Sequence, residues 1–360
     1  MVFPPRSRQN YRRHRHQGKS TTSSLLSHVF RVNHVPTLLL GNIGTAPLSY
    51  VNQTTSQTVT VLELSAHQLQ DLTVSPHVAV VQNITSEHLD YYATRESYVA
   101  AKSPIVRFQK RRDYYVYCDE FPTCRDFAHL TPATKLTYGL KKTPEHQCFI
   151  QGHAVFYRSS PTSLPQSVLN LRLIKLLGRH NYYNLMPSII VGHLFGLSFE
   201  QIATAIYRFT PLRHRLEYVA TVNGSDYYND SLSTTPQATT AALQVFADHP
   251  VHLLAGGHER HQDYSAVAKL ILKNQVKSVI LFPTTGSRLK REITDLAIKK
   301  KLLVPDFFEV DNLADAVTIA HRQTRPGDVV LLSPGAASFG LFKDYADRGD
   351  QFCQLVRQLI

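Results

Sequence analysis

The run GKSTT at residues 18–22 has the composition of the second half of a phosphate-binding loop. In a complete loop of the form G-x-x-x-x-G-K-[ST], backbone amides surround the phosphates, the lysine reaches the β and γ oxygens, and the hydroxyl ligates Mg²⁺. Arg13 stands at the position of the first glycine, and the residues before it do not alternate like a buried strand. The run alone is equally compatible with a solvated helix start.

Two further polar groups follow apolar runs that resemble strands. Glu63 lies at the end of the run VTVLELS, and the sequence NITSEHLD, residues 83–90, follows HVAVV. Because open α/β sheets bind ligands at the carboxyl ends of their strands, both groups could hold a metal or a phosphoryl group. The alternatives are a surface glutamate in the first case and a helix start capped by Thr85 or Ser86 in the second.

Two more polar groups lie farther along the chain. The sequence HNYYN opens a helix and places Asn181 and Asn184 one turn apart on the same face, so that both amides could point at one ligand. Residues 228–236 form a polar turn before the helix QATTAALQVF. The simplest explanation of that turn is helix capping by Asp230 or Ser231.

The elements that must position these residues follow a βαβ pattern. Apolar runs alternate with helix-compatible segments, which indicates parallel α/β sheets; the runs are VTVLELS, HVAVVQN, VHLLAGG, SVILFP and DVVLLSPG. Residues 114–157 contain short strand-like pieces and turns, and they suggest a small antiparallel insert. We expect two α/β domains that meet near residues 211–213, where FEQIATAIYRF ends and the strand-turn-strand LEYVATVNGSDYYND begins.

Composition limits the possible functions. The length of 360 residues and the hydrophobic fraction of 43% suit two domains with real cores. No apolar run could span a bilayer and no secretory signal is visible, so we expect a cytoplasmic protein without membrane insertion. We also expect a monomer. The four cysteines show neither metal-type pairs nor the density of a disulfide scaffold. The net charge of +12 suits anionic ligands; nucleic acid is the competing partner, but no recognition motif supports it, so none is expected.

Over residues 18–360, the motifs and their order resemble those of the Mur ligase family. The matching series is GKSTT, GNIG, ELSAHQL, NITSEHLD, AAK, HNYYN, LRHRLE, YYNDSLSTTP, LLAGG and LLSPGAASF with KDYADRGD. The resemblance implies a three-domain enzyme, of which this chain matches the last two domains. We expect an atypical basic segment over residues 1–17. A P-loop-type central ATPase domain with a mainly parallel sheet should follow over residues 18–211, without the amino-terminal part of that domain. A Rossmann-like α/β domain should occupy residues 212–360.

The motifs are most similar to the family branch that adds D-glutamate. The implied reaction belongs to peptidoglycan synthesis: ATP phosphorylates the terminal carboxylate of UDP-N-acetylmuramoyl-L-alanine, and the amine of D-glutamate attacks the acyl phosphate. Because two polyanions must meet, such catalysis depends on Mg²⁺, here two ions, and on cationic side chains rather than on a protein nucleophile.

The resemblance also implies roles for single residues. The residues expected to bind ATP are Gly18, Lys19, Ser20, Thr21, Asn181, Asn184, Arg215 and Asp230. The expected metal ligands are Ser20, Glu63, His88 and Lys102, and Lys102 would carry a carbamate. The residues expected to contact the two other substrates are Asn42 for the muramoyl part and Thr234, Arg260, Ser338 and Tyr345 for D-glutamate. The residues expected to take part in catalysis are Lys19, His88 and Lys102.

Some assignments have alternatives. Leu232 stands where some family members have a lysine, so that contact is absent. Arg260 could bind a carboxylate bidentately, or it could be a solvated loop charge. Lys102 could equally be an exposed helix lysine that pairs with Glu96.

The amino end departs most from the family pattern. Arg13 and Arg15 occupy loop positions where glycines are usual, and a glycine conformation costs another residue about 1 kcal/mol or more. We expect that the upstream reading frame encodes an apolar strand and a UDP-binding domain, and that the chain as given is a poor ligase. The alternatives are a remnant that binds nucleotide or D-glutamate without turnover, and a sister ligase of the Mur or folylpolyglutamate type.

Overall fold

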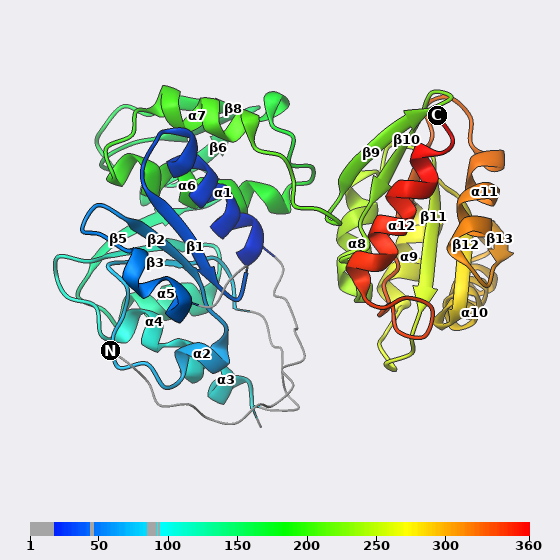
Figure 1. The fold of residues 1–360 in the computed structure, drawn as a ribbon, viewed down its shortest axis with the longest axis horizontal. Helices are drawn as coiled ribbons and strands as arrows, with labels where there is room; N and C mark the ends of the chain where they lie inside the picture. The colour runs from blue at the N-terminus through cyan, green and yellow to red at the C-terminus, as the bar shows by residue number, and fades with distance from the viewer. Residues whose placement is uncertain (1–17, 44–46, 85–91, 93) are drawn as a thin grey trace.

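The computed structural model describes residues 18–43, 47–84, 92 and 94–360 (Figure 1). Strands β1 to β8 pair among themselves, and strands β9 to β14 form a separate sheet. The segment 1–17, the capping candidates Thr85 and Ser86, and the expected metal ligand His88 lie outside the described residues.

The strands of the first part form two sheets. A two-stranded parallel sheet contains β1 (Thr37–Gly41) and β2 (Val59–Glu63). A six-stranded sheet has its strands in chain order: β3 (Val78–Val81), β4 (Tyr114–Cys118), β5 (Thr134–Tyr138), β6 (His146–Gln151), β7 (Ala154–Tyr157) and β8 (Gln166–Asn170). The strands from β3 to β6 are parallel, whereas β6, β7 and β8 pair antiparallel.

The expectation of an antiparallel insert over residues 114–157 is wrong for its first half. Strand β4 pairs in parallel with both β3 and β5, and helix α5 (Pro122–Ala128) supplies the crossover that a parallel pair needs. Tyr115 and Val116 are fully buried on opposite faces of β4, as in a central strand. The antiparallel part begins only at β6. The polar tyrosines of YYVYC obscured a strand that is buried on both faces.

Helices cover both faces of the six-stranded sheet (Figure 1). On one face pack α1 (Lys19–Val32), α6 (His180–Leu194) and α7 (Phe199–Arg208), around residues such as Phe30 and Ile189. On the other face lie the shorter helices α2 (Ala66–Leu69), α3 (Arg95–Lys102), α4 (Pro104–Arg107) and α5, around Tyr98 and Phe127. Two 3₁₀ turns, Pro47–Gln53 and Leu171–Leu173, complete this part.

The second part is one continuous sheet. Its strands, in spatial order, are β13 (Asp306–Glu309), β12 (Val276–Thr284), β11 (Val251–Gly257), β14 (Val329–Leu332), β10 (Ser225–Asn229) and β9 (Glu217–Val222). All neighbours are parallel except the hairpin of β9 and β10. The predicted strand-turn-strand and the predicted runs VHLLAGG, SVILFP and DVVLLSPG are therefore confirmed, as is the α/β fold class.

Helices sandwich this second sheet as well. One face packs against α8 (Pro236–Val245), α9 (Ser265–Lys273) and α10 (Thr285–Lys300), and the other against α11 (Leu313–Gln323) and α12 (Tyr345–Arg357). Leu253 and Leu254 of β11 are fully buried toward opposite faces. Among the helices of the described residues, none is both long and apolar enough to cross a membrane.

Candidate active site

A cavity of about 2190 Å³ lies between the two parts of the chain. It brings together most of the residues that the sequence singled out. From the first part they are Gly18, Lys19, Glu63, Lys102 and Asn184, and from the second part Arg215, Asp230, Thr234, Arg260, Ser338 and Tyr345. The residues expected to bind the nucleotide and the residues expected to bind the amino acid therefore line the same cavity.

Helix α1 presents its amino end to this cavity. Gly18 adopts φ +100°, and a Cβ at this position would lie 2.6 Å from Oδ1 of Asn184, so a larger residue does not fit. The first turn of α1 contains no acidic residue, and its unpaired amides and helix dipole favour an anion. Nζ of Lys19 lies 3.4 Å from the carbonyl oxygen of Leu64. The helix start is not solvated, because Ser20 and Thr21 are buried.

The two asparagines of α6 share a face but bond to each other. Nδ2 of Asn184 donates to Oδ1 of Asn181 over 2.7 Å, and Nδ2 of Asn181 donates to the carbonyl of Leu177. Asn184 lines the large cavity, whereas Asn181 lines a small pocket beside Thr21 and Arg215. The structure therefore does not place both amides toward the same space.

Gln82 also lines the cavity, although the sequence motifs did not single it out. Its Nε2 donates to Oγ1 of Thr22 over 2.8 Å and to Oδ1 of Asn184 over 3.1 Å. Gln82 directly follows β3, so the rule that ligand sites lie at strand carboxyl ends could have identified it.

Glu63 lies at the carboxyl end of β2 and is only 2% exposed. Its Oε1 accepts a hydrogen bond from Nδ2 of Asn42 over 3.2 Å, whereas Oε2 is buried without a polar partner among the described residues. An ionised oxygen in this condition is costly unless a cation or a donor reaches it. Glu63 therefore fits a Mg²⁺ ligand and is not a surface glutamate.

Lys102 is buried at the end of α3, with Nζ 4.8 Å from the centre of the Tyr98 ring. This burial excludes the alternative of an exposed helix lysine. Within the described residues, no three His, Cys, Asp or Glu side chains form a group that could hold a metal ion. In this part of the chain, Glu63 could hold a metal only together with hydroxyl, lysine-derived or substrate oxygens; the expected ligand His88 lies outside it.

Two loops of the second part approach each other beside the cavity. The amide of His258 donates to the carbonyl of Ala337 over 2.9 Å, and the Arg260 guanidinium lies 5.7 Å from the Phe339 ring. The carboxylate of Glu259 accepts the amides of Arg260 and His261 and also Nη1 of Arg288 over 2.9 Å. These contacts fix the loop of Arg260 next to Ser338, so Arg260 is not simply a solvated loop charge.

Asp230 is held inside the protein at the end of β10. Its Oδ1 accepts the amide of Leu216 over 3.1 Å, and its Oδ2 accepts the hydroxyls of Ser233 and Ser333. Burial raises the pKa of Asp230 to about 6, although these hydrogen bonds favour the charged form. The capping explanation is wrong, because α8 is capped by Thr235 through a hydrogen bond to the amide of Ala238.

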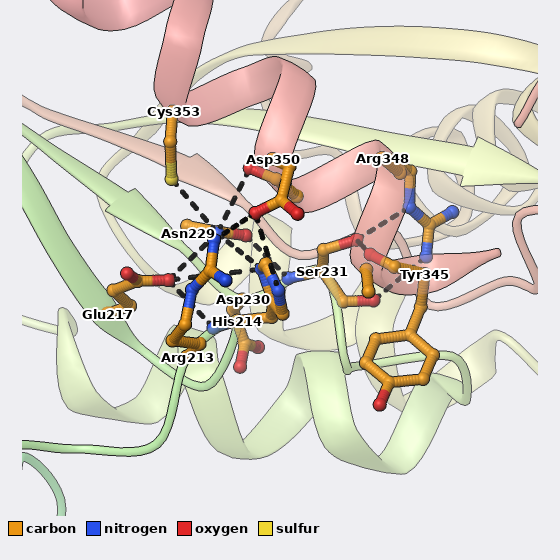
Figure 2. A network of polar contacts seen from close by, with 12 residues as sticks. Arg213, His214, Glu217, Asn229, Asp230, Ser231, Tyr345, Arg348, Asp350 and Cys353 are labelled. Atoms are coloured by element: carbon orange, nitrogen blue, oxygen red, sulfur yellow. Dashed lines mark hydrogen bonds and ion pairs between the residues drawn. The ribbon is translucent and has the colours of Figure 1, made fainter.

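Arg348 organises the polar turn that follows Asp230 (Figure 2). It is 1% exposed; Nε donates to Oγ of Ser231, and Nη2 donates to the Ser231 carbonyl, each over 2.9 Å. The guanidinium also reaches the carbonyl of Ala336 over 3.3 Å, and Oγ of Ser231 donates to the carbonyl of Tyr345. Arg348 thereby joins the turn after β10, the loop after β14 and the start of α12.

Burial lowers the pKa of Arg348 to about 9, against the opposing effect of Asp230, so Arg348 stays protonated at neutral pH. Arg348 belongs to the motif KDYADRGD, but the motif alone does not indicate a role for it. Its contacts with Ser231 lie 117 residues away in the chain and those with Ala336 lie 12 residues away, and no local pattern reveals them.

A second polar cluster lies where the chain enters the second part (Figure 2). His214 adopts φ +63°, its amide donates to Oε2 of Glu217, and its Nδ1 lies 3.0 Å from Nδ2 of Asn229. Burial lowers the pKa of His214, while Glu217 and Asp350 act in the opposite direction. Arg213 pairs with Asp350 of α12, so this entry segment is tied to the same helix as Arg348.

Family models match both parts of the chain. Residues 17–192 match the Mur ligase middle domain, and residues 214–335 match the Mur ligase glutamate ligase domain. The chain is 34% identical over 343 residues to a UDP-N-acetylmuramoylalanine–D-glutamate ligase from Geobacillus kaustophilus, covering 95% of this chain and 73% of the relative. It is 33% identical over 344 residues to an enzyme of the same name from Symbiobacterium thermophilum, with 95% and 74% covered.

Solved structures show the same fold. The MurF ligase from Thermotoga maritima in complex with ADP superposes with a TM-score of 0.68 at 17% identity, covering 95% of this chain and 78% of that one. The UDP-N-acetylmuramate–alanine ligase MurC from the same organism has a TM-score of 0.68 at 16% identity, with 95% and 74% covered.

Proposed function

The chain belongs to the Mur ligase family, and we propose that its site serves the D-glutamate-adding reaction of peptidoglycan precursor synthesis. In this reaction ATP phosphorylates the carboxylate of UDP-N-acetylmuramoyl-L-alanine, and the amine of D-glutamate then forms the amide and releases phosphate. The observation that carries the proposal is the single cavity that contains Lys19 and Glu63 on one side and Arg260 and Ser338 on the other.

The nucleotide would lie against the first part. The amides at the start of α1 and the Lys19 ammonium are suited to the phosphates, and Asn184 lies directly behind Gly18. Asn181 is proposed for the adenine side. Arg215 and Asp230 would approach the nucleotide from the second part, and both border the same cavity.

Mg²⁺ would neutralise the charge that develops on the transferred phosphoryl group. Glu63 and the hydroxyl of Ser20 are the proposed ligands among the described residues, with His88 and a carbamate on Lys102 completing sites for two ions. The unpaired Oε2 of Glu63 and the burial of Lys102 support this assignment. Asn42, bonded to Glu63, would contact the muramoyl substrate close to the metal.

D-Glutamate would bind at the two loops of the second part. Its carboxylates would meet the guanidinium of Arg260 and the hydroxyl of Ser338, with Thr234 and Tyr345 beside them. The contact between His258 and Ala337 holds these loops together before substrate arrives, which limits the entropy lost on binding.

We also propose the division into domains at residues 211 and 212, a monomeric state and a cytoplasmic location. Residue 211 lies in the linker between α7 and β9, and a peptidoglycan precursor ligase would use cytoplasmic ATP and nucleotide sugar.

Calorimetric titration tests the proposed ligands. We expect saturable binding of Mg²⁺·ATP and of D-glutamate, and no comparable binding of L-lysine or meso-diaminopimelate. Lys19→Ala should abolish nucleotide binding, whereas Lys299→Ala, on the exposed face of α10, should leave it unchanged. Binding of L-lysine in place of D-glutamate would favour a sister ligase.

Phosphate release separates a ligase from a non-catalytic remnant. With ATP, UDP-N-acetylmuramoyl-L-alanine and D-glutamate together, a ligase releases phosphate only when all three are present. Binding without any phosphate release would favour the remnant.

A further inference from the structure

Helix α10 ends in a group of exposed apolar side chains. Ile298, in the last turn of the helix, is 73% exposed, and Leu303, three residues beyond the helix, is 95% exposed. Leu302 and Val304, on either side of Leu303, are each close to half exposed. Leaving such side chains in water forfeits the free energy that their burial would supply. Exposed apolar residues gathered in this way mark an interaction surface rather than scattered surface residues.

The same segment is basic. Lys299, Lys300 and Lys301 stand between Ile298 and Leu302, and all seven residues from 298 to 304 are exposed. Among the described residues, no ion pair joins these three lysines to a carboxylate. Residues 298–304, here named the α10 tip, therefore combine three unpaired cations with four apolar side chains and contain no carboxylate.

The backbone determines how the α10 tip leaves the helix. Lys301 adopts the left-handed conformation with φ +54°. Its amide donates to the carbonyl of Ile298 over 3.2 Å, and the amide of Leu302 donates to the carbonyl of Ala297 over 3.0 Å. This pair of hydrogen bonds is the Schellman arrangement that ends many helices. It turns the chain at Lys301, so residues 302–304 do not continue the helix.

The α10 tip lies at the edge of the second sheet where its parallel strands begin. Strands β11 to β14 are parallel, and the tip leads directly into β13. Helix α9, which packs beside α10, ends at the same edge with the exposed Lys273, and β12 begins there with the exposed Lys277. The exposed carboxylates of Asp295 and Asp306 flank the tip, so lysines are in excess along this edge.

This edge is remote from the large cavity. Helix α10 begins beside the loop of Arg260, where Oγ1 of Thr285 donates to the carbonyl of Gly257 over 3.0 Å. Its 16 residues then span about 24 Å. Residues 298–304 do not line the cavity, and α10 and β13 lie on the side of the second part that is farther from the first part (Figure 1). A surface bound at the α10 tip would therefore leave the cavity open.

We propose that the α10 tip binds the anionic surface of a lipid bilayer. Its apolar side chains enter the boundary between head groups and acyl chains, and its three lysines contact the acidic head groups. The lysine side chains suit this position, because their aliphatic stems can lie in the apolar layer while the ammonium groups stay in water. This is attachment to the surface of the bilayer, without a helix that crosses it. It does not depend on the reaction proposed for the cavity.

The mixture of charges and apolar side chains favours a bilayer over other partners. A second copy of the chain, docked tip to tip, would bring two sets of lysines together, and like charges disfavour such an interface. Nucleic acid would attract the lysines through its phosphates, but phosphate contacts leave Leu303 in water. An anionic bilayer offers both an acidic surface and an apolar layer directly beneath it.

Flotation of the whole chain with vesicles tests this proposal. The test vesicles contain equal parts of phosphatidylglycerol and phosphatidylcholine, and the control vesicles contain phosphatidylcholine alone. We expect binding to the anionic vesicles to be about tenfold tighter or more, and to weaken as salt is added. Because the arginines of residues 1–17 also attract anionic lipid, variants must show which part of the chain binds.

Two leucines provide a matched pair of variants. Leu303 is 95% exposed, and Leu164, in the first part, is 93% exposed. Replacing either by aspartate changes the net charge equally, and neither change should unfold the protein, because both side chains lie in water. We expect Leu303→Asp to weaken binding to the anionic vesicles by about tenfold or more. Leu164→Asp should weaken it by less than about twofold, since a distant charge is screened.

The lysines have a matched control as well. Joint replacement of Lys299, Lys300 and Lys301 by glutamine should weaken binding by about fivefold for each charge removed. The control is joint replacement of residues 110–112 by glutamine, since these are also three consecutive exposed basic residues, and they lie in the first part. It removes the same charge and should have little effect.

Several results would overturn the proposal. They are absence of binding to the anionic vesicles, equal binding to both kinds of vesicle, and binding that survives Leu303→Asp. Binding to soluble poly-glutamate that is as strong as vesicle binding and does not require Leu303 would also overturn it, and would assign the lysines to an acidic polymer instead. Loss of vesicle binding in the Leu303 and lysine variants, with both controls unchanged, would support it.

Discussion

The two parts of the chain follow the same βαβ pattern but differ in how completely their sheets are paired. The second part has one continuous sheet with helices on both faces, whereas in the first part the described strands β2 and β3 do not pair with each other. The buried polar groups of the two parts also differ in how completely they are hydrogen-bonded. Arg348 and Asp230 have several hydrogen-bond partners, but Oε2 of Glu63 and Oγ1 of Thr21 are buried without one among the described residues.

This difference shows where the site is already organised and where it must be completed. The amino-acid side is held rigidly by contacts within the protein, so binding there requires little rearrangement. The phosphate and metal side contains buried oxygens that a cation or an anion must satisfy. The following predictions test this contrast, from the largest expected effect to the smallest.

Removing the Arg348 guanidinium should have the largest effect on stability. Arg348→Met leaves the Ser231 and Ala336 carbonyls without their donor and removes a positive charge near Asp230, which keeps only that of Arg215. We expect the free energy of unfolding to fall by about 3–5 kcal/mol in urea titrations. Arg357→Met, at the exposed end of α12, is the control and should change it by less than about 0.5 kcal/mol. A small loss in Arg348→Met would contradict the account of the network.

Leucines in the two sheets should respond differently to truncation. Leu331→Ala, in the fully buried centre of β14, should cost about 2–5 kcal/mol through the cavity it creates. Leu62→Ala, in β2, removes a side chain that is 43% exposed and should cost less than about 1 kcal/mol. Chemical unfolding of both variants checks the contrast. Equal losses would mean that β2 is packed as tightly as β14.

Much of the second sheet was predictable, because β11 and β14 are continuous apolar runs buried on both faces. Strand β4 was not, because its tyrosines carry polar hydroxyls into the core; Oη of Tyr115, for example, donates to the carbonyl of Cys124. The roles proposed for Lys19 and Glu63 come from local motifs. The role of Arg348 could not be predicted, since its partner Ser231 comes from a distant segment. The separation of β2 from β3 among the described residues could not be predicted either, since a sequence does not show which strand edges pair.

Glu63→Gln should reduce the stabilisation by Mg²⁺·ATP more than it changes the stability of the protein without ligand. Without ligand, removing a buried unpaired charge should leave the free energy of unfolding unchanged or raise it by about 1 kcal/mol. With Mg²⁺·ATP, the wild-type chain should gain thermal stability and the variant should gain less. Glu96→Gln, on the exposed surface of α3, is the matched control. Equal stabilisation of all three proteins would remove Glu63 from the metal site.

Asp230 should make the free energy of unfolding modestly dependent on pH. Its pKa rises from 3.8 to about 6 in the folded protein because of burial, so the folded state binds this proton more tightly than the unfolded state. The resulting stabilisation is fully present below about pH 4 and is lost as the pH rises through about 6. In Asp230→Asn this decline should disappear. Parallel pH dependences of the two proteins between pH 4 and 7 would show that Asp230 does not titrate in this range.

The most direct test of the account is hydrogen exchange with each substrate added separately. Mg²⁺·ATP should slow exchange at residues 18–22 and 180–184, and D-glutamate should slow it at residues 257–262 and 333–345, with L-lysine as the control amino acid. This result would place the nucleotide and the accepted amino acid on opposite sides of one cavity. Protection by L-lysine equal to that by D-glutamate, or no protection at residues 18–22 with Mg²⁺·ATP, would contradict the proposed D-glutamate ligase site.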